Sequence, residues 1–363
     1  MSNTRKVAEL ADVSIGTVSR VLNNKPGVSE PTRQRVLAVA QELGYAAPKR
    51  VPVGRSQITH LGLLIRPTEP DPISNPFYSD IYHSVEQSCR DLQINLSFSA
   101  LDMVGSRLRS LPALANDERI SGLILVGAIP EAIIESLLRA LHARHGSNGF
   151  PLVLVDDWFP RRAWDAVVID NAGGTSLAVE MLTKRGHRHI TLIGGPDHPS
   201  IVERTNAYVQ TMLQSGLQPV IVSASNLDPQ DGEAAVSEIL REQPATTAIV
   251  CSNDSQAVGA LRRLNEMGFA VPENFSVVGF DDIAMAELTL PRLTTIRVDR
   301  VAMGRSAVEL LLNHIRTPER APIKSVVGVT LVERDSVCPP RSDELARLGT
   351  TPPLSHAPAQ SRA

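Results

Sequence analysis

The sequence of 363 residues has few of the features that mark secreted or membrane proteins. Its three cysteines, Cys89, Cys251 and Cys338, are far apart and form no CxxC pair. This excludes a disulfide framework and a zinc site built from cysteines alone. No run of about 18 apolar residues could span a bilayer, and the N-terminus has no apolar core of a secretory signal. We therefore expect a cytoplasmic protein.

The signature motifs of several common enzyme classes are also missing. The sequence has no GxGxxG, no GxxxxGK[ST] and no GxSxG, which dinucleotide-binding folds, P-loop NTPases and serine hydrolases usually carry. His142 with His145, and His187 with His189, have metal-like spacings, but no further ligand is adjacent to either pair. Surface histidines explain them better. We predict that the protein is not an enzyme, with no catalytic residues, no metal and no cofactor.

The net charge of −3 hides an asymmetry along the chain. Residues 1–60 hold nine Lys or Arg against four Asp or Glu, whereas the remainder holds 27 against 35. A basic head on an acidic body predicts that only the head meets an anionic partner. The length favours two or three domains, and a hydrophobic content of 42% is enough for a full core.

Three short helices are predicted near the N-terminus, over about 5–12, 15–23 and from the N-cap Ser29 to the stop at Gly44. Such a trio, with a turn between the first two helices, predicts a helix-turn-helix. The alternative is a small helical bundle that only stabilises the body. The second helix exposes small polar groups and one arginine, which favours DNA binding. Hydroxyls of this helix can reach phosphates, and its arginine can reach a guanine edge; these side chains are Ser14, Thr17, Ser19 and Arg20.

From residue 60 onward, apolar runs alternate with amphipathic stretches. Nine runs predict strands that are buried on both faces, at 61–66, 94–99, 122–127, 151–156, 166–170, 190–195, 219–223, 247–252 and 275–280. Helices are predicted between most of them, at 76–93, 130–145, 171–186, 203–216, 229–242, 254–268 and 299–316. Repeated β-α units predict parallel, doubly wound sheets. The strands are too many for one compact sheet, so we expect two similar α/β lobes with a ligand between them.

The predicted fold class is a three-helix head joined by a linker to a two-lobed α/β body. The head covers 1–46, a hinge or linker 47–59, the ligand-binding and dimerisation body 60–339, and a disordered tail 340–363. Because the βα pattern restarts near residue 160, the N-lobe is expected at about 60–159 and 290–320. The C-lobe is expected at about 160–289 and 321–339.

Residues 5–45 closely resemble the DNA-binding head of the lac repressor/galactose repressor family of bacterial transcription regulators. The resemblance extends over about residues 5–338 through NPFY (75–78), LVDD (154–157), VVIDN (167–171), GHRHITLIGG (186–195), CSNDSQAVGAL (251–261), VPENFSVVGFDDI (271–283) and LTTIRVD (293–299). It implies a body of the periplasmic-binding-protein type. It also implies a homodimer whose second helices enter the major groove of a near-palindromic operator on the nucleoid. A small ligand between the lobes would change the affinity for DNA.

The resemblance assigns roles to residues of the second helix. Ile15 and Gly16 match the two specificity positions, and Arg20 matches the third base-reading position. Ile15 can touch only apolar base surface such as a thymine methyl, and Gly16 reads nothing directly. The preference of the protein for a particular operator sequence should therefore depend mainly on Arg20 and on the linker. The positions that match phosphate contacts are Thr17, Ser19 and Asn23.

The linker departs from the family pattern. Related proteins form a short hinge helix here, and a leucine wedges into the minor groove. In this chain Pro52 falls within the hinge and Gly54 aligns with the leucine, and a proline inside a helix costs roughly 3 kcal/mol. Two alternatives stay open: an extended strand in the minor groove, or a solvated basic tether. The basic residues that would face the groove are Lys49, Arg50 and Arg55.

The resemblance also implies an effector site between the lobes. An aromatic side chain would pack on the ligand, and acids, an arginine and an amide would bond its hydroxyls. Each of these residues could instead pack the lobes or cap a helix. The matching residues are Phe77, Asp156, Arg204, Asn253 and Asp281, with Tyr78 and Trp158 as additional candidates.

These features predict a repressor of carbohydrate-utilisation genes that leaves its operator when a sugar-like effector binds. One alternative is a repressor that needs a purine-type corepressor, and another is control by a phosphocarrier protein. From a different class, the chain could be a cytosolic sugar-binding protein with a non-functional head. The expected partners are therefore operator DNA, a small effector and a second copy of the chain, with no membrane.

Overall fold

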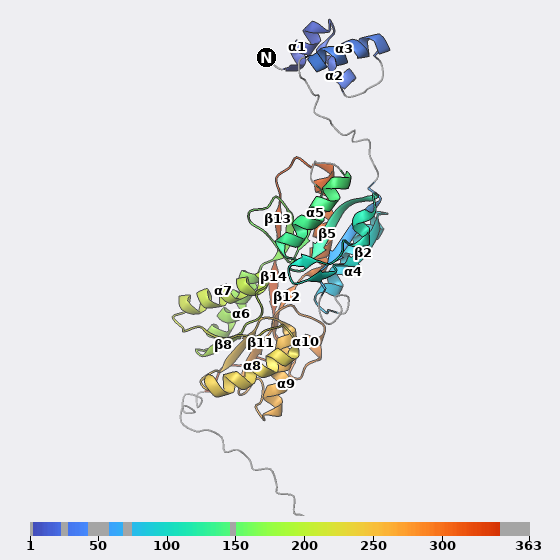
Figure 1. Cartoon of the computed structure of the whole chain (residues 1–363). Coiled ribbons are helices and arrows are strands. Elements are labelled where there is room, and N and C mark those ends of the chain that lie inside the picture. The colour runs from blue at the N-terminus through green and yellow to red at the C-terminus, as the bar shows by residue number, and fades with distance from the viewer. Residues whose placement is uncertain (1–2, 23–27, 43–57, 68–74, 146–149, 342–363) are drawn as a thin grey trace, which may run out of the picture. The chain divides into compact units, whose positions relative to one another are not determined.

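The computed structural model describes residues 3–22, 28–42, 58–67, 75–145 and 150–341. The chain divides into two units, Met1–Ile58 and Thr59–Ala363, which we call the head and the body and describe separately (Figure 1). Among the described residues, no helix has the length and apolar character needed to cross a bilayer.

The head contains the three predicted helices, α1 (Asn3–Leu10), α2 (Ile15–Leu22) and α3 (Glu30–Glu42). Their apolar faces meet in a core that includes Val7, Val18 and Val36, each fully buried. Between α1 and α2 the chain turns at Asp12, which has a φ of 51°. Asp tolerates this left-handed conformation better than most residues, so α2 can cross α1 after a short turn.

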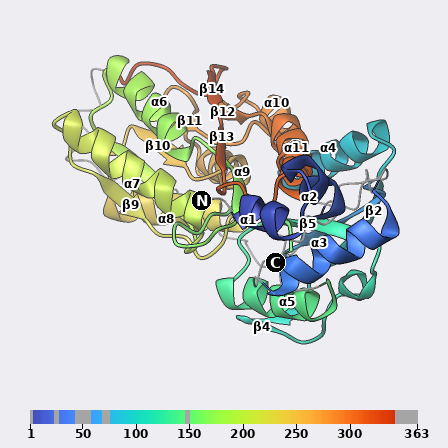
Figure 2. The same ribbon diagram turned by 90° about the horizontal axis from the view of Figure 1, so that it is seen from above.

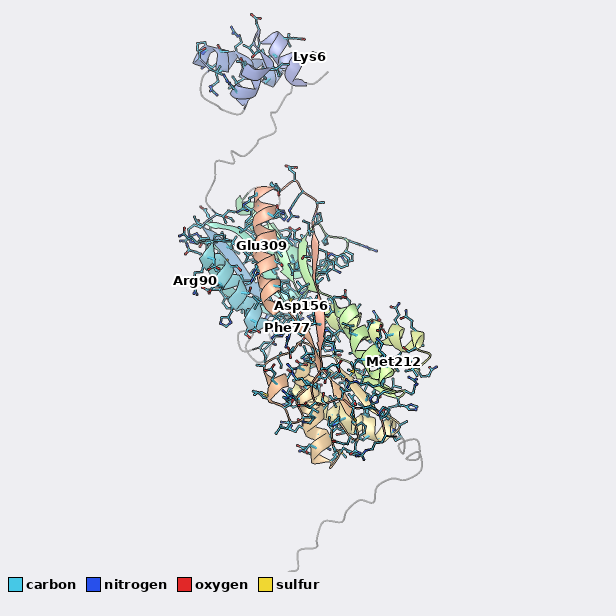
Figure 3. The ribbon with its side chains drawn as sticks, turned by 180° about the vertical axis from the view of Figure 1, so that it is seen from behind. Lys6, Phe77, Arg90, Asp156, Met212 and Glu309 are labelled. Carbon is cyan, nitrogen blue, oxygen red and sulfur yellow. The ribbon has the colours of Figure 1, made fainter. Side chains whose placement is uncertain are left out.

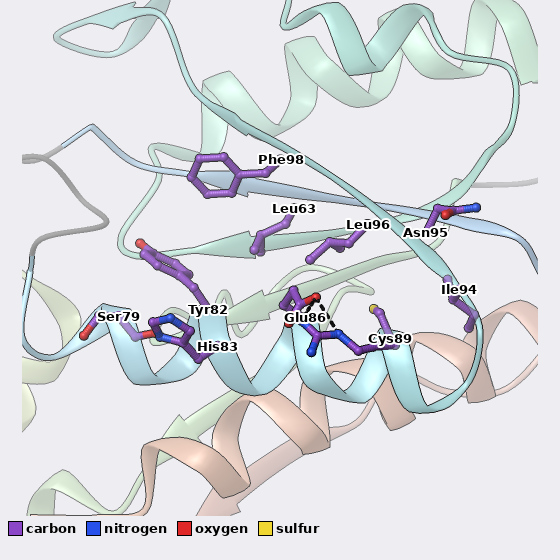
Figure 4. A pocket seen from close by; sticks show the side chains of 11 residues that line it. Leu63, Ser79, Tyr82, His83, Glu86, Cys89, Ile94, Asn95, Leu96 and Phe98 are labelled. Atoms are coloured by element: carbon purple, nitrogen blue, oxygen red, sulfur yellow. Dashed lines mark hydrogen bonds and ion pairs between the residues drawn. The ribbon is translucent and has the colours of Figure 1, made fainter.

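The first lobe of the body is built on a six-stranded parallel sheet in the order β13-β7-β6-β5-β1-β2. The strands are β1 (His60–Ile65), β2 (Asn95–Ala100), β5 (Ile120–Val126), β6 (Leu152–Val155), β7 (Asp165–Ile169) and β13 (Lys324–Val327). Helix α5 (Glu131–His145) covers one face, and α4 (Tyr78–Asp91) and α11 (Arg300–Arg316) cover the other (Figure 4). Burial on both faces explains why the central strands are continuous apolar runs.

The second lobe is built on a four-stranded parallel sheet in the order β11-β10-β8-β9. The strands are β8 (Ile190–Ile193), β9 (Val220–Val222), β10 (Ala248–Cys251) and β11 (Ser276–Val278). The helices are α6 (Asn171–Lys184), α7 (Pro199–Gln214), α8 (Pro229–Glu242), α9 (Asp254–Glu266) and α10 (Met285–Leu288). Helices α6 and α7 pack together, as do α8 and α9 (Figure 2). All nine predicted strands form, each within two residues of its expected ends.

Two further strands, β12 (Thr295–Val298) and β14 (Val329–Val332), pair antiparallel where the lobes meet (Figure 1). The chain passes between the lobes after β7, after β12 and between β13 and β14. This corrects the expected lobe limits at about 160 and 321, because β7 and β13 pair with each other in the sheet of the first lobe. The repeat of the βα pattern does not show where the chain crosses, since strand pairing depends on tertiary contacts.

The sequence patterns also missed several short elements. Between β2 and β5 the chain forms a hairpin of β3 (Met103–Val104) and β4 (Arg107–Leu108), followed by the 3₁₀ helix Ala113–Asn116. Such two-residue strands show no periodicity. The hairpin and the 3₁₀ helix lie against α5 in the core of the first lobe.

Candidate functional site

Helix α2 presents the predicted base-reading residues to solvent. Ile15, Gly16 and Arg20 are all exposed, and the Ile15 side chain is 51% exposed although it is apolar. An exposed branched side chain at the start of a helix gains no stability from the core, which favours a role in contact with a partner. Ser19 lies in α2, and its side chain is not described. Four predicted DNA contacts, Asn23, Lys49, Arg50 and Arg55, lie outside the described residues, as does the hinge with Pro52 and Gly54.

Ser14 and Thr17 have a structural role in addition to the predicted one. The Thr17 amide donates to Ser14 Oγ at 3.0 Å, and the two hydroxyl oxygens lie 2.9 Å apart. Ser14 therefore caps the N-terminus of α2, where backbone amides also favour an anion such as phosphate. Contacts of both hydroxyls with phosphate stay a prediction.

In the body, the structure brings together residues from both lobes around Asp156, which follows β6. Tyr78, at the start of α4, donates its hydroxyl to Asp156 Oδ2 at 2.9 Å. From the second lobe, Ser200 Oγ donates to Asp156 Oδ1 at 2.6 Å, and His198 Nε2 lies 3.6 Å from Oδ2. The Phe77 ring packs edge-on against Tyr78, with the ring centres 5.1 Å apart. Phe77 and Asp156 lie at the junction of the lobes (Figure 3).

Arg204, on α7, is the centre of the second half of this group. Its Nε donates to Asn171 Oδ1 at 2.9 Å, and its Nη1 donates to the Ser252 carbonyl at 2.5 Å. Its Nη2 forms an ion pair with Asp281 Oδ1 at 3.4 Å, and its guanidinium lies 3.6 Å from the centre of the Phe280 ring. Because Arg204 is only 4% exposed, these partners fix its position. We call this group the interlobe site; its members are Phe77, Tyr78, Asp156, Asn171, His198, Ser200, Arg204, Ser252, Phe280 and Asp281.

Burial controls the charges in the interlobe site. It raises the pKa of Asp281 to about 6, although Arg204 and Arg300 oppose the shift. It also raises the pKa of Tyr78 well above its usual value, with a further contribution from Asp156. Burial lowers the pKa of His198, so its ring is neutral at pH 7. The Ser200 amide donates to His198 Nδ1 at 3.2 Å, which places the ring proton on Nε2, toward Asp156.

Two acids of the interlobe site have positive φ values, 64° at Asp156 and 115° at Asp281. The value at Asp156 lies in the left-handed region that Asp tolerates, as at Asp12. The value at Asp281 is one that residues other than glycine rarely adopt, and it persists only where surrounding contacts hold it. Asp156 directly follows β6, and Asp281 comes three residues after β11. Both therefore lie at the carboxyl end of a parallel sheet, where ligands bind in doubly wound folds.

Two predicted effector residues have other partners in this structure. Asn253 caps α9, because its Oδ1 accepts from the Gln256 amide at 2.8 Å and its Nδ2 donates to the Leu227 carbonyl at 3.0 Å. Trp158 lies beside Lys324, whose Nζ is 3.8 Å from the ring centre. Their contact with an effector stays a prediction.

Sequence reasoning missed several members of the group. His198 and Ser200 follow the end of β8 and the Gly194-Gly195 pair. Their place after the carboxyl end of a buried strand was the signal that could have identified them. The other missed members are Asn171, Ser252 and Phe280, each of which lies one or two residues after the end of a strand.

Comparison with known proteins shows which family has this arrangement. Residues 5–47 match the model for bacterial regulatory proteins of the lacI family, and residues 179–337 match the periplasmic binding protein-like domain. The ribose operon repressor of Haemophilus influenzae is 30% identical over 345 residues, which cover 93% of this chain and 99% of the relative. The chain belongs to the lacI family. The regulator MalR of Streptomyces coelicolor is 34% identical over 316 residues, covering 85% of this chain and 89% of the relative.

Solved structures show the same architecture. The complex of the regulator CelR with cellobiose aligns with a TM-score of 0.67 at 27% identity, covering 93% of this chain and all of that one. The lac repressor dimer bound to operator and an anti-inducer aligns with a TM-score of 0.65 at 26% identity, covering 92% of this chain and 98% of that one. This lacI-family chain is thus a DNA-binding transcriptional repressor with a helix-turn-helix head and a two-lobed body of the periplasmic-binding type.

Proposed function

We propose that this repressor controls carbohydrate-utilisation genes and leaves its operator when a sugar binds at the interlobe site. The observation that carries the proposal is the set of Tyr78 and the buried Asp156, Arg204 and Asp281, drawn from both lobes. Carboxylates and a guanidinium suit the vicinal hydroxyls of a sugar, and the Phe77 ring suits its apolar face. Because its target is operator DNA, we place the repressor in the cytoplasm, on the nucleoid.

Release can follow from the bonds between the lobes. In this structure, Asp156 of the first lobe accepts from Ser200 of the second. A sugar hydroxyl that takes over this carboxylate would replace a direct bond between lobes by a bond through the ligand. His198 Nε2 has no hydrogen-bond partner among the described residues, which leaves a donor for a further hydroxyl. A ligand that binds one lobe arrangement more tightly shifts the population toward it.

The relatives support two kinds of effector. The ribose operon repressor, the CelR complex with cellobiose and a lacI-family structure with bound ribose support a sugar. The transcriptional repressor PurR of Vibrio atlanticus is 28% identical over 342 residues, and the alternative of a purine corepressor rests on this likeness. The planes of Phe77 and Tyr78 meet at 79°. Two such rings do not form the parallel walls that would enclose a flat purine, which favours a sugar.

We also propose that the repressor is a homodimer. A groove of about 450 Å³ lies between α4 and the edge strand β2, and its lining includes Leu63, Leu96 and Phe98 (Figure 4). The Phe98 side chain is 43% exposed, and Leu288 and Leu290 of the second lobe are 73% and 93% exposed. Apolar side chains at an open strand edge favour a second copy of the chain as the occupant. Two heads side by side would read a near-palindromic operator.

The dimer can be tested by sedimentation of the full chain. Phe98→Glu and Leu290→Glu should each shift the dimer toward monomer, because both would bury a charge between the copies. Leu213→Glu is the matched control, since Leu213 is 56% exposed on α7 in the second lobe. A dimer that persists in both variants would contradict this interface.

The effector class can be tested by a thermal-shift screen of the full chain with ribose, maltose, cellobiose, hypoxanthine and guanine. A ligand at about 100 times its Kd adds roughly 2.7 kcal/mol of stability. We expect a shift with one sugar, its loss in Asp156→Asn, and weaker binding of the protein to DNA upstream of its own gene. Arg188→Ala, an exposed change on the second lobe, should keep the shift. A purine that shifts the protein and strengthens DNA binding would overturn the sugar assignment.

A further inference from the structure

Arg300, the first residue of α11, connects three segments of the body. Its Nε donates to Asp80 Oδ2 at 2.9 Å, and Asp80 lies in the first turn of α4 in the first lobe. Its Nη1 donates to the Asp281 carbonyl, and its Nη2 donates to the Asp282 carbonyl at 3.2 Å. Both carbonyls follow β11 in the second lobe. The Arg300 side chain is only 11% exposed, so one guanidinium that is largely shielded from solvent bonds both lobes.

The segment that Arg300 holds in the second lobe has an unusual backbone. Asp281 has a φ of 115° and Asp282 a φ of 54°. The Asp281 amide donates to the Ile296 carbonyl at 2.8 Å, and the Asp282 carboxylate is held by Arg297 at 2.6 Å and by Arg334 at 2.7 Å. Only Arg300 among these partners binds the two carbonyls and also reaches the other lobe. The backbone angles it holds aim the Asp281 carboxylate at Arg204.

The segment that Arg300 holds in the first lobe, the first turn of α4, lies between the interlobe site and the proposed dimer surface along the helix. Asp80 lies two residues after Tyr78, which bonds Asp156 in the interlobe site. Helix α4 packs closely on α11, because Ser84 Oγ donates to the Val301 carbonyl at 2.6 Å and a Cβ on Gly304 would lie 2.7 Å from the Ile81 carbonyl oxygen. Farther along, the same helix lines the groove of Figure 4. Motion of its first turn therefore reaches the proposed dimer surface.

We propose that Arg300 is a positioning residue that couples the Asp281 loop to helix α4 and thereby transmits occupancy of the interlobe site to the dimer surface. When an effector takes the Asp281 carboxylate, the loop changes, and the guanidinium carries the change to Asp80. The planar fork of arginine is required, because it donates in three fixed directions, whereas a lysine ammonium acts as a single point charge. The transmission rests on the proposed effector site, but the coupling of loop and helix does not.

The coupling can be tested without any ligand, by hydrogen exchange of the full chain. In Arg300→Gln, amides of α4 near Asp80 and amides of the 281–286 segment should both exchange at least about tenfold faster, since a charge-assisted bond is lost at each. Asp80→Asn, an exposed change, should speed exchange in both segments too. Arg297→Gln is the matched control, because Arg297 binds the same loop but not α4. Faster exchange in only one segment of Arg300→Gln, or an equal effect of Arg297→Gln on α4, would overturn the coupling.

Transmission is tested with the sugar that gives the largest thermal shift among ribose, maltose and cellobiose. In Arg300→Lys we expect the Kd for that sugar to change less than about threefold, while the ratio of DNA affinities without and with sugar falls at least about fivefold, because coupling is a free energy separate from binding. Arg297→Gln should keep the ratio. An unchanged ratio in Arg300→Lys would overturn the proposal. Absence of a shift with every sugar would count against the effector class alone, and the exchange experiment would still decide the role of Arg300.

Discussion

The head and the interlobe site carry out their recognition with opposite kinds of surface. In the head, the candidate contacts Ile15, Gly16 and Arg20 lie within one helix and are exposed. In the interlobe site, Asp156, Arg204 and Asp281 come from distant segments, are at most 6% exposed and bond to other side chains. A substitution in the head should therefore change binding alone, whereas one in the interlobe site should change binding and folding together.

The difference also determines how the two regions respond to the solvent. Contacts between basic side chains and phosphates release counterions, so affinity of the head for DNA should fall steeply with salt. Charges in the interlobe site are removed from solvent and are screened much less. Their behaviour depends instead on burial, which raises the pKa of Asp281 and lowers that of His198.

The largest effect is expected from Arg204→Ala. This change leaves the Asp281 carboxylate and the Asn171 amide oxygen buried with lost partners, which costs about 3–5 kcal/mol of unfolding free energy. Urea denaturation of the body measures the loss. A cost below about 1 kcal/mol would show that the site is held by other contacts, and that the contrast with the head is wrong.

A pH titration of Asp281→Asn sharpens the same contrast. The pKa of Asp281 in the folded protein, about 6, exceeds the ordinary value of about 3.9. The folded state therefore binds the extra proton, and the stability that this group contributes at pH 4 is lost as the pH rises through 6. Asparagine does not titrate, so the variant should gain about 2–3 kcal/mol relative to the parent between pH 4 and pH 7. Denaturation at both pH values checks this, and a constant difference would contradict the raised pKa.

Arg20→Ala tests the head. Loss of a bidentate contact with guanine should weaken binding to the upstream DNA by about 1–3 kcal/mol and relax the preference at one base pair. The unfolding free energy should stay within about 0.5 kcal/mol of the parent, because Arg20 is exposed. Gel shifts and denaturation give the two values. An equal loss in both would place Arg20 among the residues that stabilise the head.

The smallest effect is expected from Asn253→Ala, which removes the cap of α9. We expect a loss of about 1 kcal/mol. Asn253→Asp and Asn253→Ser keep the capping oxygen and should recover most of this stability. If both restore stability but not the thermal shift by the effector, then Asn253 also contacts the ligand, as the family resemblance predicts.

Local patterns predicted most elements correctly. The head helices form at the expected places because their apolar faces, caps and the Asp12 turn are all encoded within a few residues. The continuous apolar runs marked every central strand of both sheets. The patterns failed at β3 and β4, which are too short for periodicity, and at the lobe membership of β7 and β13.

The sequence by itself determined the family, the head with its recognition helix, and the identity of Asp156, Arg204 and Asp281 as candidates, because these depend on local order and on motif residues. Only the tertiary structure decided which strands share a sheet, that His198 and Ser200 meet Asp156 across the lobes, and that Arg300 joins Asp80 to the Asp281 loop. The reason is that these contacts join residues 40 to more than 200 positions apart. No periodicity along the chain records such a distance; the three crossings between the lobes bring the residues together.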